Sequence, residues 1–460
     1  MQLFEDFCLS DGEKPLDGMS VFFVGIGGVS MSALARLSRM LGAVVSGYDR
    51  EPEAARRALG VPDISVSADM SALPAGVALV VYTLAVTTEH PLLREASRRG
   101  VRVLSRPAYL GALMRRYRVR IGISGTHGKS TVTAMTDAVF ASAGRHPTTL
   151  CGAALPFGNP LRPGGRETLI YEACEYRDAF LSFSPTDAVL LDAEWDHTDY
   201  FPDTKALSTS FFRAGALATE RVILSADDKT TAAMTGKFSV PTVTFGRHGS
   251  PDLLYTPYPL RDGRYGFSAA FRGKALGDIC LSVPGAFQTA NAAAALTAAL
   301  CRDIPFDTAA AALVGFCGIE RRLQVIGNVH GVPVVYDYAH HPTEIRAGIR
   351  TVCDMYGHAT VIFRPHTYSR TADLWDGFVS ALGEADRIYI LDIYAAREAP
   401  RPGVTSAALT AAVGPRAAYI KEAELPAAMA TAEGALLLMG AGDMDAACRL
   451  VAEGNTKEKE

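Results

Sequence analysis

A lysine follows a glycine-rich loop between a predicted strand and a predicted helix. The segment is Ile121-Gly-Ile-Ser-Gly-Thr-His-Gly-Lys-Ser-Thr131. In loops of this type, backbone N–H groups surround phosphate oxygens, the lysine neutralises charge on the β- and γ-phosphates, and the next hydroxyl binds Mg²⁺. Lys129 and Ser130 occupy those two positions. The strict pattern G-x-x-x-x-G-K-[ST] is not met, because Ile123 stands where its first glycine belongs. We predict a shortened phosphate loop that begins at Gly125; the alternative is a loop with an exposed lysine.

Acidic and imidazole side chains follow two further predicted strands, Leu169–Glu172 and Ala188–Leu191. Glu172 and Glu175 stand at the end of the first strand, and His197 stands after the second. Ligands of open α/β sheets bind outside the carboxyl ends of the strands. Carboxylate and imidazole groups near the phosphate loop could complete the shell of a divalent cation, and Mg²⁺ prefers oxygen ligands. The competing interpretation is ordinary solvated charge on loops.

A second glycine turn lies near the N-terminus. The turn Gly25–Gly28 follows the predicted strand Val21–Val24, and Asp49 follows the next predicted strand. Glycines at such a turn let the backbone approach a diphosphate at a helix N-terminus, and an acid about twenty residues later suits a ribose or base hydroxyl. Ser30 occupies the third glycine position, so the fingerprint is incomplete. It fits a nicotinamide-dependent oxidoreductase, which would leave the phosphate loop without a role, or simply a tight turn that needs glycine.

Cations and histidines gather at predicted strand ends in the last third of the chain. They occur in Arg321-Arg322, Asp337–Pro342 and Arg364–Arg370. Paired arginines can neutralise a transferring phosphate, and the fork of Arg370 could hold a carboxylate through two hydrogen bonds. The pair His340-His341 could bind zinc, but no carboxylate–His–Cys spacing supports that interpretation.

The elements that must position these residues form three successive α/β patterns. Short β-branched runs alternate with helical segments, which is typical of a parallel sheet covered by helices. The pattern restarts near Arg116–Arg118 and after Gly315–Gly318. We therefore predict three α/β domains in series, at residues 1–107, 108–317 and 318–460. The predicted strands are Val21–Val24, Ala43–Ser46, Ala78–Tyr82, Arg102–Leu104, Arg120–Ser124, Leu169–Glu172, Ala188–Leu191, Val332–Asp337, Thr360–Phe363, Arg387–Asp392 and Leu436–Met439. The predicted helices are Ser30–Leu41, His90–Arg99, Thr131–Ser142 and Ala286–Leu300, with four more beginning near Pro342, Ala372, Ser406 and Met444.

Composition narrows the class of protein. The chain has 460 residues, of which 48% are hydrophobic, so it can bury a large core. Its 45 basic and 49 acidic residues give a net charge of −4, which argues against nucleic acid or a membrane surface as a partner. The N-terminus MQLFEDFCLSDGEKP lacks the apolar region of a secretory signal. Eight cysteines without any C-x-x-C pair indicate reduced thiols. We expect a cytoplasmic protein that is a monomer or a weak homo-oligomer.

The motifs, taken together, resemble the Mur ligase family. The matching motifs, in chain order, are Gly-Ile-Gly-Gly-x-x-Met-Ser, Gly-Thr-His-Gly-Lys-Ser, Glu-Ala-Cys-Glu, Asp-His-Thr-Asp, Arg-Arg, Asp-Tyr-Ala-His-His-Pro-Thr-Glu, Pro-His-Thr-Tyr-Ser-Arg-Thr and Met439-Gly-Ala-Gly-Asp443. The resemblance covers nearly the whole chain. It also explains the shortened phosphate loop, because Gly-Thr-His-Gly-Lys is the family's own variant.

This resemblance implies a fold and a reaction. It implies an N-terminal Rossmann-like domain for a UDP-sugar, a central P-loop-type ATPase domain, and a C-terminal Rossmann-like domain that closes over them. The motifs are most similar to those of the member that adds the first amino acid in peptidoglycan synthesis. The implied cofactors are ATP and Mg²⁺, and the implied substrates are UDP-N-acetylmuramate and L-alanine, joined through an acyl phosphate. A peptide-recycling ligase of the same family and a non-enzymatic nucleotide sensor are the alternatives.

The resemblance also implies roles for single residues. ATP would be bound by Gly125, Thr126, His127, Gly128, Lys129, Ser130, Thr131, Asn291, Arg321, Arg322 and Asp337. Mg²⁺ would be held by Ser130, Glu172 and His197. The UDP-sugar and the amino acid would contact Gly25, Gly27, Gly28, Val29, Ser30, Asp49, His127, Glu175, Tyr338, His340 and Arg370. Catalysis would depend on Lys129, His197, Arg322 and His340.

Two positions depart from the family's pattern. Phe287-Gln288 stands where members commonly have His-Asn, so only Asn291 carries over to the adenine site. Phe212 stands where relatives that add later residues carry a carbamoylated lysine. Its presence fits a first-step ligase.

Overall fold

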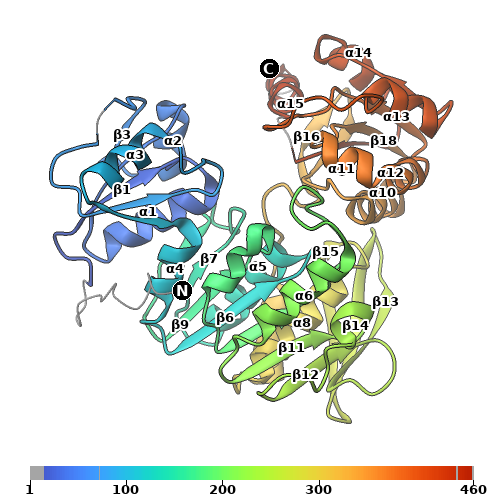
Figure 1. The fold of residues 1–460 in the computed structure, drawn as a ribbon. Coiled ribbons are helices and arrows are strands. Elements are labelled where there is room, and N and C mark those ends of the chain that lie inside the picture. The colour runs from blue at the N-terminus through green and yellow to red at the C-terminus, as the bar shows by residue number, and fades with distance from the viewer. Residues whose placement is uncertain (1–14, 72, 442–443, 458–460) are drawn as a thin grey trace.

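The computed structural model describes residues 15–71, 73–441 and 444–457. The N-terminal segment at 1–14, which includes Cys8, lies outside these ranges, as do Gly442 and Asp443 of the last motif. Figure 1 shows three α/β bodies, with the first and third standing side by side on the central one. Each contains its own sheet, which confirms the predicted three-domain α/β class.

The N-terminal domain has a five-stranded parallel sheet with the order β3-β2-β1-β4-β5. The order reverses between β1 and β4, so the turn after β1 opens at the switch point where such sheets bind ligands. Its strands are β1 Ser20–Val24, β2 Val44–Tyr48, β3 Ser65–Ser67, β4 Leu79–Tyr82 and β5 Arg102–Ser105. Its helices are α1 Val29–Met40, α2 Pro52–Leu59 and α3 Pro91–Arg98.

The central domain has a ten-stranded sheet with the order β15-β14-β13-β12-β11-β10-β6-β9-β7-β8. Its strands are β6 Val119–Ser124, β7 Thr148–Leu150, β8 Leu161–Arg162, β9 Thr168–Glu172, β10 Asp187–Leu190, β11 Arg221–Ser225, β12 Thr242–Gly246, β13 Leu253–Pro259, β14 Arg264–Phe271 and β15 Lys274–Pro284. Its helices are α4 Arg106–Met114, α5 Lys129–Ser142, the 3-10 helix η1 Tyr176–Ser182, α6 Thr204–Gly215, α7 Lys229–Ala232, α8 Gln288–Leu300 and α9 Phe306–Val314. Strand β6 lies between β10 and β9, so the phosphate loop and both acidic segments emerge at one edge of the sheet.

Helix α4 joins the first two domains. The carbonyl oxygen of Ser182 lies so close to Gly111 that no side chain fits at this position. Glycine therefore lets α4 pack tightly on η1. The boundary predicted after residue 107 falls inside this helix.

The C-terminal domain has a six-stranded sheet with the order β16-β17-β21-β18-β19-β20, in which only the β16–β17 pair is antiparallel. Its strands are β16 Gln324–Val329, β17 Val332–Asp337, β18 Ala359–Phe363, β19 Arg387–Ile390, β20 Ala417–Tyr419 and β21 Ala435–Met439. Its helices are α10 Pro342–Tyr356, α11 Tyr368–Asp373, α12 Trp375–Leu382, α13 Ser406–Val413, the 3-10 helix η2 Glu422–Glu424, α14 Leu425–Met429 and α15 Asp445–Lys457.

The structure corrects the helix predicted to begin near Ala372. Helix α11 begins at Tyr368, because the hydroxyl of Thr367 accepts the Arg370 N–H at 3.4 Å and caps the first turn. A second helix, α12, begins at Trp375. Arg370 therefore lies on a helix.

Two smaller observations concern the class of protein that the composition indicated. None of the seven cysteines that the structure describes forms a disulfide. Within the described ranges, none of the helices has the length and apolarity needed to cross a membrane.

Candidate active site

The phosphate loop joins β6 to α5 and depends on glycine at position 128. Gly128 adopts a left-handed conformation (φ 78°) directly before the first residue of α5. A methyl group there would lie 2.5 Å from Asn291 Oδ1. Only glycine satisfies both conditions, and the close approach brings Asn291 on α8 against the loop, as the adenine-site prediction requires.

Lys129 is folded back into the loop. Its ammonium group donates hydrogen bonds to the carbonyl oxygens of Gly125 and Thr126, the latter at 3.0 Å, and to Glu175 Oε1 at 3.0 Å. Burial alone would lower the pKa of Lys129, but the Glu175 carboxylate outweighs it and holds the pKa above the usual value. The cation is therefore permanent, and its partner is a buried carboxylate that phosphate oxygens can replace.

The expected metal ligands lie beside this lysine. Ser130 Oγ donates to Glu172 Oε2 at 2.6 Å, and the same oxygen accepts the Gly152 N–H at 2.9 Å. His197 Nε2 lies 3.4 Å from Glu175 Oε1. The other oxygen, Glu175 Oε2, is buried and receives no hydrogen bond from any residue in the described ranges. An unsatisfied buried carboxylate oxygen, a hydroxyl and a second carboxylate form an oxygen-rich donor set that fits Mg²⁺ and its waters.

The C-terminal domain contacts this site through the start of α10. His127 lies between two carboxylates, with Nε2 2.9 Å from Glu194 Oε2 and Nδ1 3.2 Å from Glu344 Oε1. Burial would lower its pKa, but the two carboxylates raise it well above the usual value, so the ring is an imidazolium. Thr343 Oγ1 donates to Glu194 Oε1 at 2.8 Å. One charged ring and one hydroxyl therefore join the two domains.

His341 is held in place by hydrogen bonds to neighbouring backbone groups. With His127 and Glu194 it brings three potential metal-ligand atoms within 4.8 Å of one another. However, its Nδ1 accepts the Thr343 N–H at 3.3 Å and its Nε2 lies 3.3 Å from the carbonyl of Trp195. Both ring nitrogens of His341 therefore have partners within the protein.

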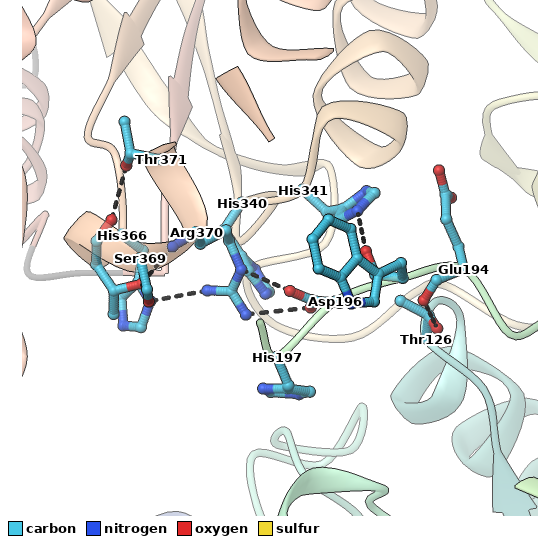
Figure 2. Close-up of polar contacts among 12 residues, drawn as sticks. Thr126, Glu194, Asp196, His197, His340, His341, His366, Ser369, Arg370 and Thr371 are labelled. Carbon is cyan, nitrogen blue, oxygen red and sulfur yellow. Dashed lines mark hydrogen bonds and ion pairs between the residues drawn. The ribbon is translucent and has the colours of Figure 1, made fainter. Parts of the chain in front are cut away.

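The most buried link between the two domains is an ion pair (Figure 2). Arg370 Nε donates to Asp196 Oδ1 at 2.7 Å and its second terminal nitrogen donates to Oδ2 at 3.1 Å. The side chains are 7% and 6% exposed. Burial would raise the pKa of Asp196, but Arg370 holds it well below the usual value. The remaining terminal nitrogen of Arg370 donates to His366 Nδ1 at 2.9 Å.

His340 lies next to this pair as a neutral imidazole. Burial and the charge of Arg370 lower its pKa to about 4, against the opposing effect of Glu344. Its Nδ1 lies 2.9 Å from the carbonyl oxygen of Tyr338. Because a carbonyl only accepts, Nδ1 carries the proton and Nε2 offers a lone pair. Tyr338 packs edge-on against the same ring, at 5.7 Å between centroids.

Two adjoining cavities lie between the central and C-terminal domains, with volumes of about 240 and 450 Å³. Asn291 and Asp337 line the first, and Arg322 lines both. Arg321 is exposed and lies over the ring of Tyr336 instead. Burial raises the pKa of Asp337 to about 7. Residues expected for ATP thus gather at one place, and Arg321 stands apart.

The two departures from the family pattern have defined surroundings. Phe287 and Gln288 line the first cavity. Gln288 Oε1 accepts a hydrogen bond from Asn291 Nδ2 at 2.9 Å, which fixes the orientation of that amide. Phe212 stacks on Phe238 at 5.1 Å between centroids, within an apolar cluster.

A third cavity, of about 690 Å³, opens at the glycine turn of the N-terminal domain. Gly25, Gly28 and Asp49 line it. Asp49 Oδ2 accepts the Gly27 N–H at 2.8 Å, so the acid holds the turn as well as facing the cavity. Val29 and Ser30 form the first residues of α1 and are exposed.

The backbone conformation and the surrounding space differ among the three glycines of this turn. Gly25 has φ 81°, and a methyl group there would lie 2.6 Å from Thr83 Cγ2. At Gly27 it would lie 2.7 Å from Ala55 Cβ. At Gly28, which has an ordinary φ of −62°, the nearest neighbouring atom would be 3.7 Å away. Packing therefore requires Gly25 and Gly27, whereas Gly28 leaves space in the cavity.

We expect Gly25→Ala to affect stability and Gly28→Ala to affect binding. Gly25→Ala should lower the unfolding free energy by about 1–2 kcal/mol, because an L-residue is strained at positive φ. Gly28→Ala should leave stability unchanged and weaken nucleotide-sugar binding severalfold. Thermal unfolding and calorimetric titration measure the two effects. Equal destabilisation by both substitutions would show that Gly28 also has a packing role.

Comparison with known proteins identifies the family. Sequence models of the catalytic, middle and glutamate ligase domains of Mur ligases match residues 20–118, 123–299 and 321–444. The chain is 36% identical over 392 residues to UDP-N-acetylmuramate–L-alanine ligase of Caldicellulosiruptor saccharolyticus, across 84% of this chain and 86% of the relative. The chain belongs to the Mur ligase family. It is therefore an ATP-dependent ligase, as the motif set predicted.

Further relatives of this Mur ligase agree. The enzyme of the same name from Acidobacterium capsulatum is 35% identical over 446 residues, across 94% of this chain and 97% of its own. A crystal structure of the UDP-N-acetylmuramate–alanine ligase of Thermotoga maritima superposes with a TM-score of 0.81 at 25% identity, covering 96% of this chain and all of that one. A murein peptide ligase of Psychrobacter arcticus superposes with a TM-score of 0.73 at 23% identity, covering 95% of this chain and 99% of that one. This similarity shows a shared fold.

Three carboxylates of the Mur ligase site were absent from the residues predicted for it. They are Glu194, Asp196 and Glu344, which hold His127 and Arg370. Glu194 and Asp196 flank Trp195 in the acidic segment before His197, and Glu344 follows the His-His-Pro motif. Each of them lies beside a motif already identified from the sequence, which was the available sign of a role. The neighbouring sequence does not show which basic side chain each carboxylate contacts.

Proposed function

We propose that this Mur ligase joins the amino group of L-alanine to the lactyl carboxylate of UDP-N-acetylmuramate, with cleavage of ATP to ADP and phosphate. The observation that carries the proposal is the meeting of two half-sites. The central domain supplies Lys129 for the phosphates and Glu172 for the metal, and the C-terminal domain supplies His340 and Arg370 beside them. The named relatives, at 34–36% identity, support this amino-acid specificity. We also propose that the reaction takes place in the cytoplasm, where ATP is available.

The first chemical step is attack of the lactyl carboxylate on the γ-phosphorus of ATP. A carboxylate oxygen forms a bond to phosphorus, the bond to the β-phosphate oxygen breaks, and ADP leaves with an acyl phosphate remaining. Such a step needs positioning and charge neutralisation above all. Lys129 and Arg322 would face the phosphates from opposite domains. Ser130, Glu172 and His197 would hold Mg²⁺, which would supply further neutralising charge when bound.

The second step is attack of the alanine amine on the acyl carbon. The C–N bond forms, the C–O bond to phosphate breaks, and the amine proton ends on the departing phosphate, which leaves as hydrogen phosphate. His340 offers its Nε2 lone pair to the amine and would orient it through a hydrogen bond. Because its pKa is about 4, the ring is a weak base and would not keep the proton. The end of Arg370 would hold the alanine carboxylate. Closure by α10 and α11 excludes water, which would hydrolyse the acyl phosphate.

We expect purified protein to release ADP only when ATP, Mg²⁺, UDP-N-acetylmuramate and L-alanine are all present. A coupled assay for ADP, with each component omitted in turn, measures this dependence. Replacing alanine by the tripeptide L-alanyl-γ-D-glutamyl-meso-diaminopimelate is the control. Equal turnover with that tripeptide would move the assignment to a peptide-recycling ligase.

A further inference from the structure

Two residues of the C-terminal domain line the glycine-turn cavity of the N-terminal domain. They are Ala396 and Arg397, from the segment between β19 and α13. The rest of the lining comes from the N-terminal domain and includes Gly25, Gly28 and Asp49. The cavity is therefore completed by the third domain.

The two cations of this lining are placed to hold a dianionic ligand from both sides. They are Arg50 on the N-terminal domain and Arg397 on the C-terminal domain. The two acids of the lining are engaged elsewhere, since Asp49 accepts the Gly27 N–H and Glu89 pairs with Arg94. Burial lowers the pKa of His90, which makes that ring neutral. Both arginines are exposed and neither forms an ion pair with a carboxylate in the described part of the chain. Two free guanidinium groups beside a glycine turn match the two charges of a diphosphate.

Arg397 is presented by a segment that is fixed to the C-terminal domain. Tyr394 stacks on His366 at 5.6 Å between centroids, and its N–H donates to the Pro365 carbonyl at 2.8 Å. Glu398 accepts the Ser369 N–H at 2.7 Å and also the Ser369 hydroxyl. The residue before Arg397 adopts a left-handed backbone conformation (φ 53°), which turns the chain at the cavity.

Ser369 directly precedes Arg370 in α11. The loop that carries Arg397 and the helix that carries Arg370 are therefore one rigid unit. Arg370 is bound to Asp196 of the central domain, so a ligand that holds Arg397 also helps to hold Arg370 at the central site.

We propose that Arg397 binds the diphosphate of the nucleotide-sugar substrate from the C-terminal domain, so that this substrate helps to hold closed the domain that carries Arg370. The inference rests on the proposed function, because that function supplies the nucleoside diphosphate. Arg397 is a substrate-binding residue in this assignment, and the coupling makes amino-acid recognition dependent on nucleotide-sugar occupancy.

Three variants of the full chain test this role: Arg397→Ala, Arg397→Lys and the control Arg401→Ala. Arg401 is an exposed arginine of the same segment that pairs with Asp373 at 3.4 Å and is absent from the cavity lining. Isothermal titration with UDP-N-acetylmuramate and with uridine gives the affinities. Arg397→Ala should raise the Kd for UDP-N-acetylmuramate about tenfold, the size expected for one charge-assisted contact. The Kd for uridine and the KM for ATP should not change.

Arg397→Lys should keep part of the affinity, and Arg401→Ala should bind like the unmodified protein. Small-angle scattering should show compaction by UDP-N-acetylmuramate in the unmodified protein and less compaction in Arg397→Ala. Unchanged UDP-N-acetylmuramate affinity in Arg397→Ala, or an equal loss for uridine, would overturn the diphosphate contact while leaving the proposed function intact. Absence of UDP-N-acetylmuramate binding by the unmodified protein would instead overturn the proposed function, and this inference with it.

Discussion

Replacing Lys129 with alanine should lower kcat by at least about a hundredfold, which corresponds to roughly 3 kcal/mol of transition-state stabilisation. Lys129 is the buried cation of the phosphate loop, and its ammonium group already lies 3.0 Å from a carboxylate oxygen of Glu175. When ATP binds, phosphate oxygens compete for that cation, and the charge that develops on the transferring phosphoryl strengthens the contact. A steady-state assay of ADP release measures the loss.

Binding of UDP-N-acetylmuramate should persist in the same variant, because its cavity lies at the turn after β1, in another domain. The matched control is Lys229→Ala, which removes an exposed lysine of the central domain. Removing Lys129 also leaves Glu175 buried without its cation, so the pKa of Glu175 should rise. The double variant Lys129→Ala, Glu175→Gln separates the two effects by restoring stability without restoring turnover. Full turnover in Lys129→Ala would rule out the loop as the phosphate site.

The local parts of this site could be predicted because short segments determine them. The glycine spacing before Lys129 and the apolar runs on either side were enough to place β6, the loop and α5 within one or two residues. The same holds for Gly25–Gly28 after β1. In each case the loop geometry depends on neighbours in the chain, such as the left-handed φ of Gly128.

The antiparallel ribbon β13–β15 was not predicted, although its signal is present. Strand β15 alternates buried and exposed residues over its second half, as a strand with one covered face should. Prolines at 257 and 259 in β13 weaken a strand assignment from the sequence. They are tolerated because β12 pairs only with Leu253 and Leu254, so the end of β13 that carries the prolines is paired on one side alone.

Contacts between domains carry no local signal. Asp196 and Arg370 are 174 positions apart, and His127 and Glu344 are 217 apart. Residue type suggested that Arg370 would hold a carboxylate, and the structure gives it one from the protein itself. Which carboxylate meets which cation depends on how two folded domains meet, and this orientation cannot be read from either segment alone.

The ion pair with Asp196 changes how Arg370 can act on a substrate. Its guanidinium has five N–H groups, of which two bind Asp196 and one binds His366. Two remain at the end of the side chain for the α-carboxylate of alanine. Asp196 then serves to orient the fork, and the neutral His366, whose pKa burial lowers to about 3, accepts without adding charge. The alternative is that Arg370 only holds the two domains together.

Arg370→Lys should raise the KM for alanine at least about tenfold, or roughly 1.4 kcal/mol, while the KM for ATP changes little. A lysine keeps the charge but cannot span both oxygens of a carboxylate, so it loses the geometry that Asp196 fixes. Asp196→Asn keeps the size of the side chain and should raise the same constant by less. Because both substitutions act through one guanidinium, their effects in a double-mutant cycle should not add. If Arg370 only joins the domains, its substitution loosens the contact between them and also opens the cavity between Arg322 and Asn291. The KM for alanine and the KM for ATP should then rise together. That outcome, or no change in either constant, would exclude Arg370 as the group that recognises the amino acid.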